Sequence, residues 1–243
     1  MTWLGAAVDD VEARRSKHSW PVGSLLARLL PAACDALLAQ AHVRRFAPAE
    51  VLLRQGATDR HAYLILAGDV AVHIIESSGM DTMLAVRRRG DIVGELAALT
   101  GEPRSATVVA MTPVMAGVIT ASALTNVLTT YPTAAWELVR TQAHRLDWAN
   151  RRRVDFVSRR ATARVARALA DLAHEIGPGN EQPIRVELSQ RDIASIVGMA
   201  LNTAENALRS LAHHGYIERR YRAVLVIDLA GLAEFADWDR DNP

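Results

Sequence analysis

The sequence predicts an α+β protein with an N-terminal antiparallel β jelly roll, one long helix and a C-terminal winged helix-turn-helix. Three observations support this fold class. Glycines recur regularly through the first half, a long segment after Pro132 lacks both glycine and proline, and a helix-turn-helix pattern follows it. The chain has 243 residues, half of them hydrophobic, which suffices for one large domain or two ordinary ones.

Short strands are predicted between the glycines at positions 56, 68, 79, 90 and 101. The runs 62–67, 70–75 and 83–86 are rich in β-branched and aliphatic residues. The tripeptides at 67–69 and 89–91 are expected to be turns in which glycine supplies a positive φ. Short strands at this spacing are typical of an antiparallel barrel or jelly roll and not of a parallel α/β unit.

Two opposite charges, Glu95 and Arg104, lie where the chain becomes apolar, because residues 105–136 contain no charged side chain. The planar fork of arginine suits an anion with several acceptor atoms, and a partly buried charge-assisted hydrogen bond is stronger than a neutral one. We therefore expect the pair to bind a small anionic ligand, with Ser105 and backbone N–H groups sharing its charge. A structural salt bridge between Glu95 and Arg104 is the alternative.

One long helix is predicted over residues 133–157. Its proposed apolar face recurs at three- and four-residue steps and consists of Ala135, Val139, Gln142, Leu146, Ala149, Arg153 and Phe156. Gln142 and Arg153 make this stripe an imperfect coiled-coil seam. We expect the stripe to be buried against a second copy of the chain in a homodimer.

The C-terminal third predicts a DNA-binding helix-turn-helix. A helix at about 161–176 is expected to end at the sequence GPGN (177–180), and two short strands around 218–222 would form a wing. Ser189 and Asp192 between them are expected to form a capping box that begins a short helix, and Gly198 a tight turn after it. The second helix would end near Gly215, and its apolar stripe is Ala204, Leu208 and Leu211.

Several functional classes are disfavoured by the sequence. The single cysteine, Cys34, excludes an intramolecular disulfide and an all-cysteine metal site, and the net charge of +1 favours no particular partner. The N-terminus lacks a signal-peptide pattern, and proline, glycine and many hydroxyl side chains interrupt the run 105–136, so we expect a cytoplasmic protein. The chain contains no Walker, nucleophile-elbow or HExxH motif, and no enzyme is predicted.

The order of these elements resembles the cyclic-AMP receptor protein/FNR (CRP/FNR) family of bacterial transcription regulators over residues 22–228. Within this span, Gly94–Ala97 followed by Pro103–Thr107 is similar to the phosphate-binding cassette of cyclic-nucleotide domains, including those of protein-kinase regulatory subunits. The resemblance implies an N-terminal extension (1–21), a cyclic-nucleotide-binding β-roll domain (22–132), a dimerisation helix and hinge (133–160) and a winged helix-turn-helix DNA-binding domain (161–243).

The effector implied by the resemblance is a cyclic nucleotide, with cyclic AMP leading and cyclic GMP, cyclic di-GMP or an empty pocket left open. Arg104 would bind the phosphate and Glu95 the ribose 2′-hydroxyl. Ala149 and Asn150 match the family's adenine-contacting threonine and serine, and Ala149 lacks a side-chain hydrogen bond. The expected effector residues are Gly94, Glu95, Leu96, Arg104, Ser105, Ala106, Arg145, Ala149 and Asn150.

The resemblance also implies that double-stranded DNA and RNA polymerase are partners and that the effector shifts the orientation of the DNA-reading domains. Members of the family that read guanine begin the recognition helix with Ser-Arg-Glu-Thr, whereas here the sequence is Ala200–Thr203. We therefore do not expect the familiar TGTGA half-site. The expected DNA-contacting residues are Ser189, Gln190, Leu201, Asn202, Thr203, Asn206, Arg209 and His213.

Two alternatives stay open at this stage. A haem or metal sensor would fit the family, but the segment 94–96 has no histidine, and His213 and His214 are adjacent on a helix and would point in different directions. No metal is therefore expected. The second alternative is a DNA-binding protein that acts without a ligand.

Overall fold

The computed structural model of the chain describes residues 20–75, 81–176 and 183–241. The chain divides into two compact units, one made of residues up to Ile74 with Val86–Thr141 and the other of Ile75–Ala85 with residues from Gln142 onwards. The predicted turn at Gly79 and the predicted break at 177–180 lie outside the described residues. The proposed domain limits stay a prediction.

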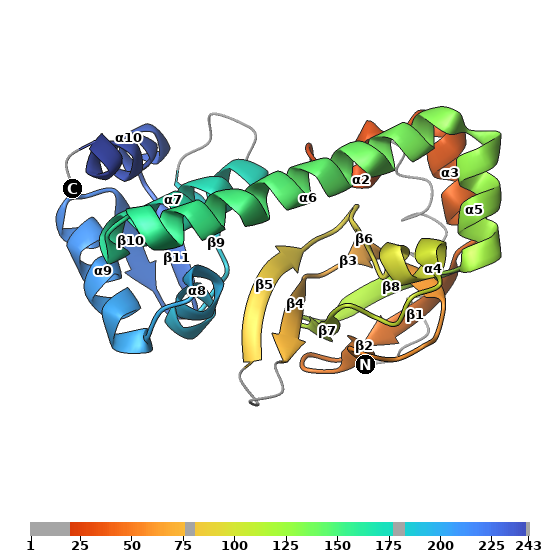
Figure 1. Cartoon of the computed structure of the whole chain (residues 1–243), viewed down its shortest axis with the longest axis horizontal. Helices are drawn as coiled ribbons and strands as arrows, with labels where there is room; N and C mark the ends of the chain where they lie inside the picture. Colours follow the sequence, from red (N-terminus) through yellow and green to blue (C-terminus); the bar gives the residue numbers. More distant parts are fainter. Residues whose placement is uncertain (1–19, 76–80, 177–182, 242–243) are drawn as a thin grey trace, which may run out of the picture. The chain divides into compact units, whose positions relative to one another are not determined.

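The strands of the jelly roll form two antiparallel sheets of four strands each within the described residues (Figure 1). One sheet has the order β1-β8-β3-β6 and the other β2-β7-β4-β5. The strands are β1 (His42–Phe46), β2 (Val51–Leu53), β3 (His61–Ala67), β4 (Val70–Ile75), β5 (Asp81–Arg87), β6 (Ile92–Val93), β7 (Thr107–Ala110) and β8 (Val114–Thr120). The predicted strands and the two predicted glycine turns are confirmed, because Gly68 and Gly90 have φ values of 81° and 89°.

Strand β3 shows why one of these runs is apolar without alternation. Tyr63 and Ile65 belong to the core cluster between the two sheets. Ala62 and Leu64 belong to a second cluster, which includes residues of the surrounding helices. A strand that is buried on both faces has an uninterrupted hydrophobic sequence.

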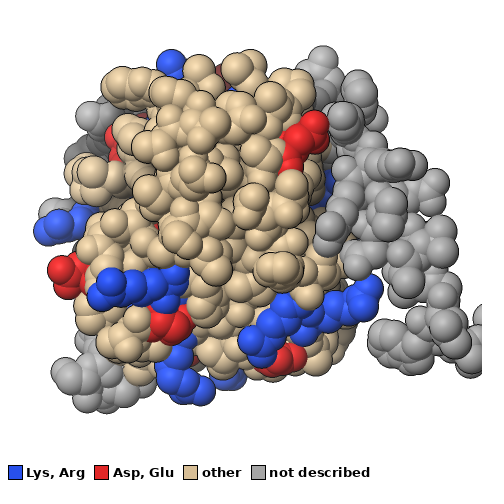
Figure 2. Space-filling model, turned by 90° about the vertical axis from the view of Figure 1, so that its right-hand side faces the viewer, with Lys and Arg blue, Asp and Glu red and all other residues tan. Residues whose placement is uncertain are grey.

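Helices α2 (Leu25–Arg28), α3 (Pro31–Ala39) and α5 (Ala121–Thr130) contribute to that second cluster, and α4 (Glu95–Thr100) follows β6. The charge-free run 105–136 forms two strands, α5 and the start of the next helix, and the outward side chains of α5 are mostly threonine, serine and asparagine. Figure 2 shows the face of the molecule at α5 as a broad uncharged area with charged side chains gathered along its lower part. Among the described residues, no helix is long and apolar enough to span a membrane.

The long helix is α6 (Pro132–Ser158), as predicted. Ala134, Leu138 and Thr141 are buried within the first unit. The large apolar side chains that α6 exposes are Trp136 (66% exposed), Val139 (55%), Leu146 (63%) and Val154 (64%). Of the predicted stripe, Val139 and Leu146 are exposed, whereas Ala135 and Gln142 are half-buried. The burial of this stripe in a dimer stays a prediction. The side chain of Phe156 lies outside the described part.

The second unit contains the winged helix-turn-helix. It consists of α7 (Ala161–Ile176), β9 (Ile184–Val186), α8 (Gln190–Val197), α9 (Leu201–His213), β10 (Ile217–Arg220), β11 (Ala223–Val226) and α10 (Leu229–Asp241). The predicted stripe is buried, because Ala204, Leu208 and Leu211 are each 0% exposed. Strand β9, which completes the sheet β10-β11-β9, and helix α10 were not predicted from the sequence.

Candidate effector and DNA-binding sites

The candidate effector site begins at a sharp turn between β6 and α4. Gly94 has a φ of 77° and Gly101 a φ of 79°, so a left-handed residue flanks each end of the short helix. A Cβ atom at Gly94 would lie 2.7 Å from Nη1 of Arg104 and 2.7 Å from Cδ1 of Leu53. Glycine is therefore required here both by the backbone and by the close approach of the Arg104 guanidinium.

Arg104 is the centre of this site and is 3% exposed. Its backbone N–H donates to the carbonyl of Ala57 at 2.9 Å, and its carbonyl accepts from Gly56 at 2.8 Å. Its Nη1 donates to the carbonyl of Gly94 at 2.7 Å, and its Nη2 donates to the carbonyl of His61 at 2.6 Å. The loop around residue 56 and the end of β6 thus fix both the backbone and the side chain of Arg104.

Asp59 is the carboxylate partner of Arg104, and the sequence analysis missed it. Its Oδ2 accepts from Nη2 of Arg104 at 2.6 Å and lies 3.2 Å from Nδ1 of His61. The hydrogen bond from Arg104 holds the pKa of the Asp59 carboxyl below its ordinary value. Burial lowers the pKa of His61, and Asp59 opposes that shift. The sequence Asp-Arg-His at the start of β3 was the available signal, but it is too common to identify a site.

Two buried nitrogen atoms in this pocket have no hydrogen-bond partner among the described residues, Nε of Arg104 and Nε2 of His61. A buried donor without a partner is costly, and such a group calls for a ligand, water or ion. Glu95 is also almost wholly buried, at 3% exposed, at the first position of α4. The site therefore holds a buried cation with one donor unpaired within the described part of the chain, and its guanidinium binds the carbonyl of the residue that precedes the buried Glu95.

The other predicted effector residues fall into two groups. Ser105 is exposed and Ala106 half-buried in the loop that follows Arg104, while Leu96 is 47% exposed on α4. Arg145, Ala149 and Asn150 lie on α6 in the second unit, where Arg145 is half-buried and the other two are exposed. The structure brings Gly94, Glu95 and Arg104 together, and contact of the α6 residues with an effector stays a prediction.

The candidate DNA-binding surface is the outer face of α9. Asn202, Thr203, Asn206, Arg209 and His213 are exposed along it, and Leu201 is half-buried at its start. Nη1 of Arg209 donates to Oδ1 of Asn206 at 3.0 Å, which couples two of the expected base-reading side chains. Such a face, with amide and guanidinium groups opposite a buried stripe, can enter a major groove.

Ser189 and Gln190 make contacts that hold this unit together, and their contact with DNA stays a prediction. Ser189 and Asp192 form the predicted capping box, with Asp192 N–H donating to the Ser189 hydroxyl at 3.2 Å and Ser189 N–H donating to Asp192 at 2.8 Å. With its amide oxygen turned toward Arg219, Gln190 accepts from Nη2 at 2.7 Å and donates to Glu205 at 3.1 Å. This bridge links the recognition helix to the wing, and sequence analysis did not predict it.

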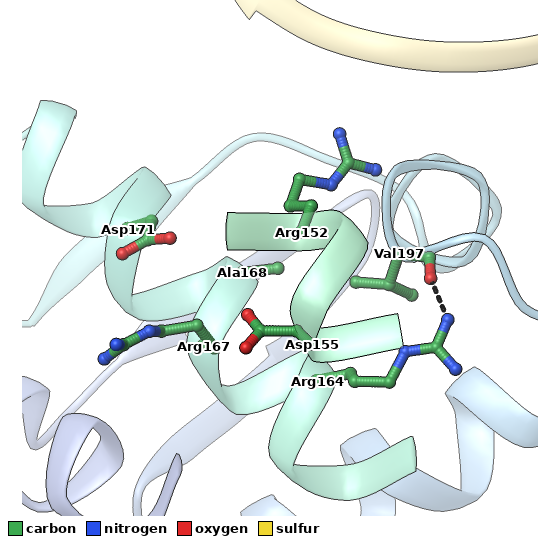
Figure 3. A pocket seen from close by; sticks show the side chains of 7 residues that line it. All are labelled: Arg152, Asp155, Arg164, Arg167, Ala168, Asp171 and Val197. Atoms are coloured by element: carbon green, nitrogen blue, oxygen red, sulfur yellow. Dashed lines mark hydrogen bonds between the residues drawn. The ribbon is translucent and has the colours of Figure 1, made fainter. Parts of the chain in front are cut away.

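A small charged pocket lies where α6, α7 and α8 meet in the second unit (Figure 3). Burial lowers the pKa of Arg152 to about 10. The arginine side chains point away from one another, and Arg164 donates to the carbonyl of Val197. Arg167 pairs with Asp237 at 3.3 Å. Because these arginine side chains diverge, we interpret the pocket as part of the packing between helices and not as an anion-binding site.

The described residues hold no cluster of three or more His, Cys, Asp or Glu side chains suited to a metal.

Comparison with known proteins identifies the two domains that carry these candidate sites. The model of the cyclic nucleotide-binding domain matches residues 43–131, and the model of the Crp-like helix-turn-helix domain matches residues 163–235. The chain belongs to the CRP/FNR family. This CRP/FNR protein is a CRP-like cyclic-nucleotide-binding transcription regulator.

Similar proteins include regulators whose names state an effector. The CRP-like cAMP-activated global transcriptional regulator of Mycobacterium tuberculosis is 29% identical over 85% of this chain and 93% of its own length. The cAMP-activated global transcriptional regulator CRP of Salmonella typhimurium is 25% identical over 78% of this chain and 91% of its own.

Solved structures show the same fold. A CRP-family transcriptional regulator of Thermus thermophilus has a TM-score of 0.64 and 26% identity, covering 80% of this chain and 96% of that one. The c-di-GMP responsive global regulator CLP of Xanthomonas campestris has a TM-score of 0.67 and 21% identity, and the match covers 81% of this chain and 98% of that one. The second similarity concerns the fold alone.

Proposed function

We propose that this CRP/FNR regulator responds to cyclic AMP bound in the pocket around Arg104 and controls transcription as a homodimer. The observation that carries the proposal is the buried Arg104 guanidinium, whose Nε has no partner among the residues that the structure describes. Glu95, which follows the Gly94 that Arg104 binds, is a buried acceptor suited to a ribose hydroxyl. A cyclic phosphodiester has one negative charge and several acceptor oxygens, which match this donor. The names of the mycobacterial and enterobacterial relatives favour cyclic AMP among the cyclic nucleotides.

Calorimetric titration of the wild-type protein and of Arg104→Ala with cyclic AMP, cyclic GMP and cyclic di-GMP tests the effector. We expect the wild type to bind cyclic AMP most tightly. Loss of one charged hydrogen bond costs about 1.5–3 kcal/mol, so Arg104→Ala should bind roughly tenfold to a hundredfold more weakly. Arg88→Ala, which removes a partly exposed arginine of the same unit that pairs with Asp69 at 3.9 Å, is the control. Equal affinity in wild type and Arg104→Ala would show that the phosphate binds elsewhere.

The proposed dimer forms through the exposed apolar face of α6 at Trp136, Val139 and Leu146. Exposed aliphatic and aromatic side chains three and seven residues apart lie on one face of a helix, which is the pattern of a helix–helix interface. Leu146→Arg should dissociate the dimer in sedimentation velocity at micromolar protein. His144→Arg, at an exposed position on another side of α6, should not. A monomeric wild-type protein under these conditions would contradict the dimer.

In the proposed role, α9 reads an operator that differs from the TGTGA half-site, and RNA polymerase is the partner at the promoter. Asn202 and Asn206 favour adenine, since an asparagine amide pairs bidentately with that base. Selection of bound sequences from a random DNA pool, followed by transcription in vitro with RNA polymerase, tests both parts. Selection of TGTGA by the wild-type protein would overturn this interpretation of α9.

A further inference from the structure

The edge of the Arg104 guanidinium that can hold a phosphate with two hydrogen bonds is already half occupied. Arginine has five N–H donors, and Nε with one N–H of Nη2 forms a side-on fork for a carboxylate or phosphate. Nη2 donates to Asp59 and to the carbonyl of His61, each at 2.6 Å, while Nε has no partner among the described residues. A phosphate that takes both positions of the fork therefore competes with an existing partner of Nη2, and Asp59 is the partner that can leave, because the other is a backbone carbonyl of β3.

We propose that Asp59 is an internal anion that occupies Arg104 in the absence of effector, and that effector binding transfers Asp59 from Arg104 to His61. The proposal rests on the proposed function, because it takes the anionic phosphate of a cyclic nucleotide as the competing group. It makes Asp59 and His61 determinants of affinity: Asp59 weakens binding by competing with the phosphate, and His61 stabilises the displaced carboxylate.

Burial and anchoring decide which partner moves. The Arg104 side chain is 2% exposed, and two backbone carbonyls, those of Gly94 and His61, hold its guanidinium. The Asp59 side chain is 41% exposed, and its carboxylate contacts the side chains of Arg104 and His61. An exposed carboxylate can rotate into water at low cost, whereas moving a buried guanidinium would leave both carbonyls without a donor. Exchange therefore displaces Asp59 and leaves Arg104 in place.

His61 is placed to receive the displaced carboxylate. Its Nδ1 is already 3.2 Å from Oδ2 of Asp59. The charged and titratable groups that face it are Asp59 and Arg104 in the flanking loops, Arg44 on β1, and Tyr63, whose ring lies edge-on at 4.9 Å. While Asp59 is paired with Arg104, burial and both arginines disfavour the charged imidazole. A bound phosphate offsets the charge of Arg104 and frees Asp59 for His61, so both changes favour the imidazolium.

Effector binding should consequently take up protons at His61. The pKa of His61 lies below its ordinary value without effector and is higher in the complex, so protonation favours the complex. The resulting gain in affinity is fully present below the pKa of the free protein and is lost as the pH rises through the pKa of the complex. We expect the affinity for cyclic AMP to fall between about pH 6 and pH 8, around the ordinary histidine pKa.

Isothermal titration with cyclic AMP tests the exchange in wild type, Asp59→Asn and His61→Gln, at several pH values and in two buffers of different ionisation enthalpy. Asp59→Asn should bind cyclic AMP roughly tenfold more tightly, which corresponds to about 1.4 kcal/mol. The wild type should take up a fraction of a proton near pH 7, and His61→Gln should take up none. Asp69→Asn removes a carboxylate from a turn of the same unit and should behave as wild type.

Each outcome bears on the proposal. Weaker binding by Asp59→Asn, with a melting temperature close to wild type, would show that Asp59 only positions Arg104 and would overturn the exchange. If Asp59→Asn bound cyclic AMP with the same affinity as Asp69→Asn, the proposal would also be wrong. Equal proton uptake by His61→Gln and the wild type would overturn it as well. Binding by Asp59→Asn where wild type fails to bind would support it. If neither protein binds any nucleotide of the panel, the proposed function is wrong and the exchange falls with it.

Discussion

Replacing Gly94 by alanine adds one carbon atom beside the Arg104 guanidinium and so tests the geometry of the effector site. The new Cβ would lie 2.7 Å from Nη1 of Arg104 and 3.2 Å from the carbonyl of His61. The left-handed φ of 77° alone costs an alanine about 1–2 kcal/mol. Relief of the contact requires Nη1 to leave the Gly94 carbonyl, which removes a charged hydrogen bond of about 1.5–3 kcal/mol. The total destabilisation should therefore be roughly 3–5 kcal/mol.

Gly23→Ala provides the matched control. Gly23 has a φ of 90°, and a Cβ atom there would have no neighbour within 4 Å, so this variant carries the backbone cost without the steric contact. Calorimetric unfolding should show that Gly94→Ala lowers the melting temperature more than Gly23→Ala does, and titration should show loss of cyclic AMP binding in Gly94→Ala alone. Equal melting temperatures, or equal affinities for cyclic AMP, in the two variants would refute the claim that glycine is required at position 94 to accommodate the Arg104 guanidinium.

Three further predictions concern other parts of the regulator. Glu95→Gln should narrow the difference in affinity between cyclic AMP and its 2′-deoxy analogue, measured by competition binding, because a neutral amide oxygen accepts a hydroxyl less strongly than a carboxylate. Ser189→Ala should destabilise the DNA-binding unit by about 1 kcal/mol through loss of the capping box, measured by thermal unfolding. Ala149→Thr should enhance the increase in operator affinity caused by cyclic AMP, measured at one fixed salt concentration, and a weaker response than wild type would contradict the expected adenine contact.

Much of the fold could be predicted from the sequence because its signals are local. Positive-φ turns require glycine, as at Gly68 and Gly90, and the capping box of Ser189 lies within three residues of its partner. Glu95 and Arg104 were selected from a motif of neighbouring residues, and both are buried. These features depend on a few neighbouring residues and on backbone geometry, which a single sequence records directly.

The missing parts depend on contacts between distant residues. Asp59 meets Arg104 across 45 positions, and Gln190 links Glu205 to Arg219 through an arrangement that no spacing rule contains. Strand β9 is three residues long and gains its partner only when the wing folds beside it. Such contacts are consequences of the tertiary fold, so a periodicity or a motif of one segment cannot indicate them.

The position of the unsatisfied polar atoms argues that the Arg104 pocket is built for a ligand. Four buried side-chain nitrogens lack a hydrogen-bond partner in the described part of the chain: Nε of Arg28, Nε2 of His61, Nε of Arg104 and Nη1 of Arg159. Arg28 and Arg159 sit singly, beside the ion-pair partners Glu137 and Asp155. Arg104 and His61 both contact the exposed carboxylate of Asp59. Because a buried donor without a partner is destabilising, the unpaired Nε of Arg104 is best explained by an anion that completes its fork and leaves Asp59 to His61.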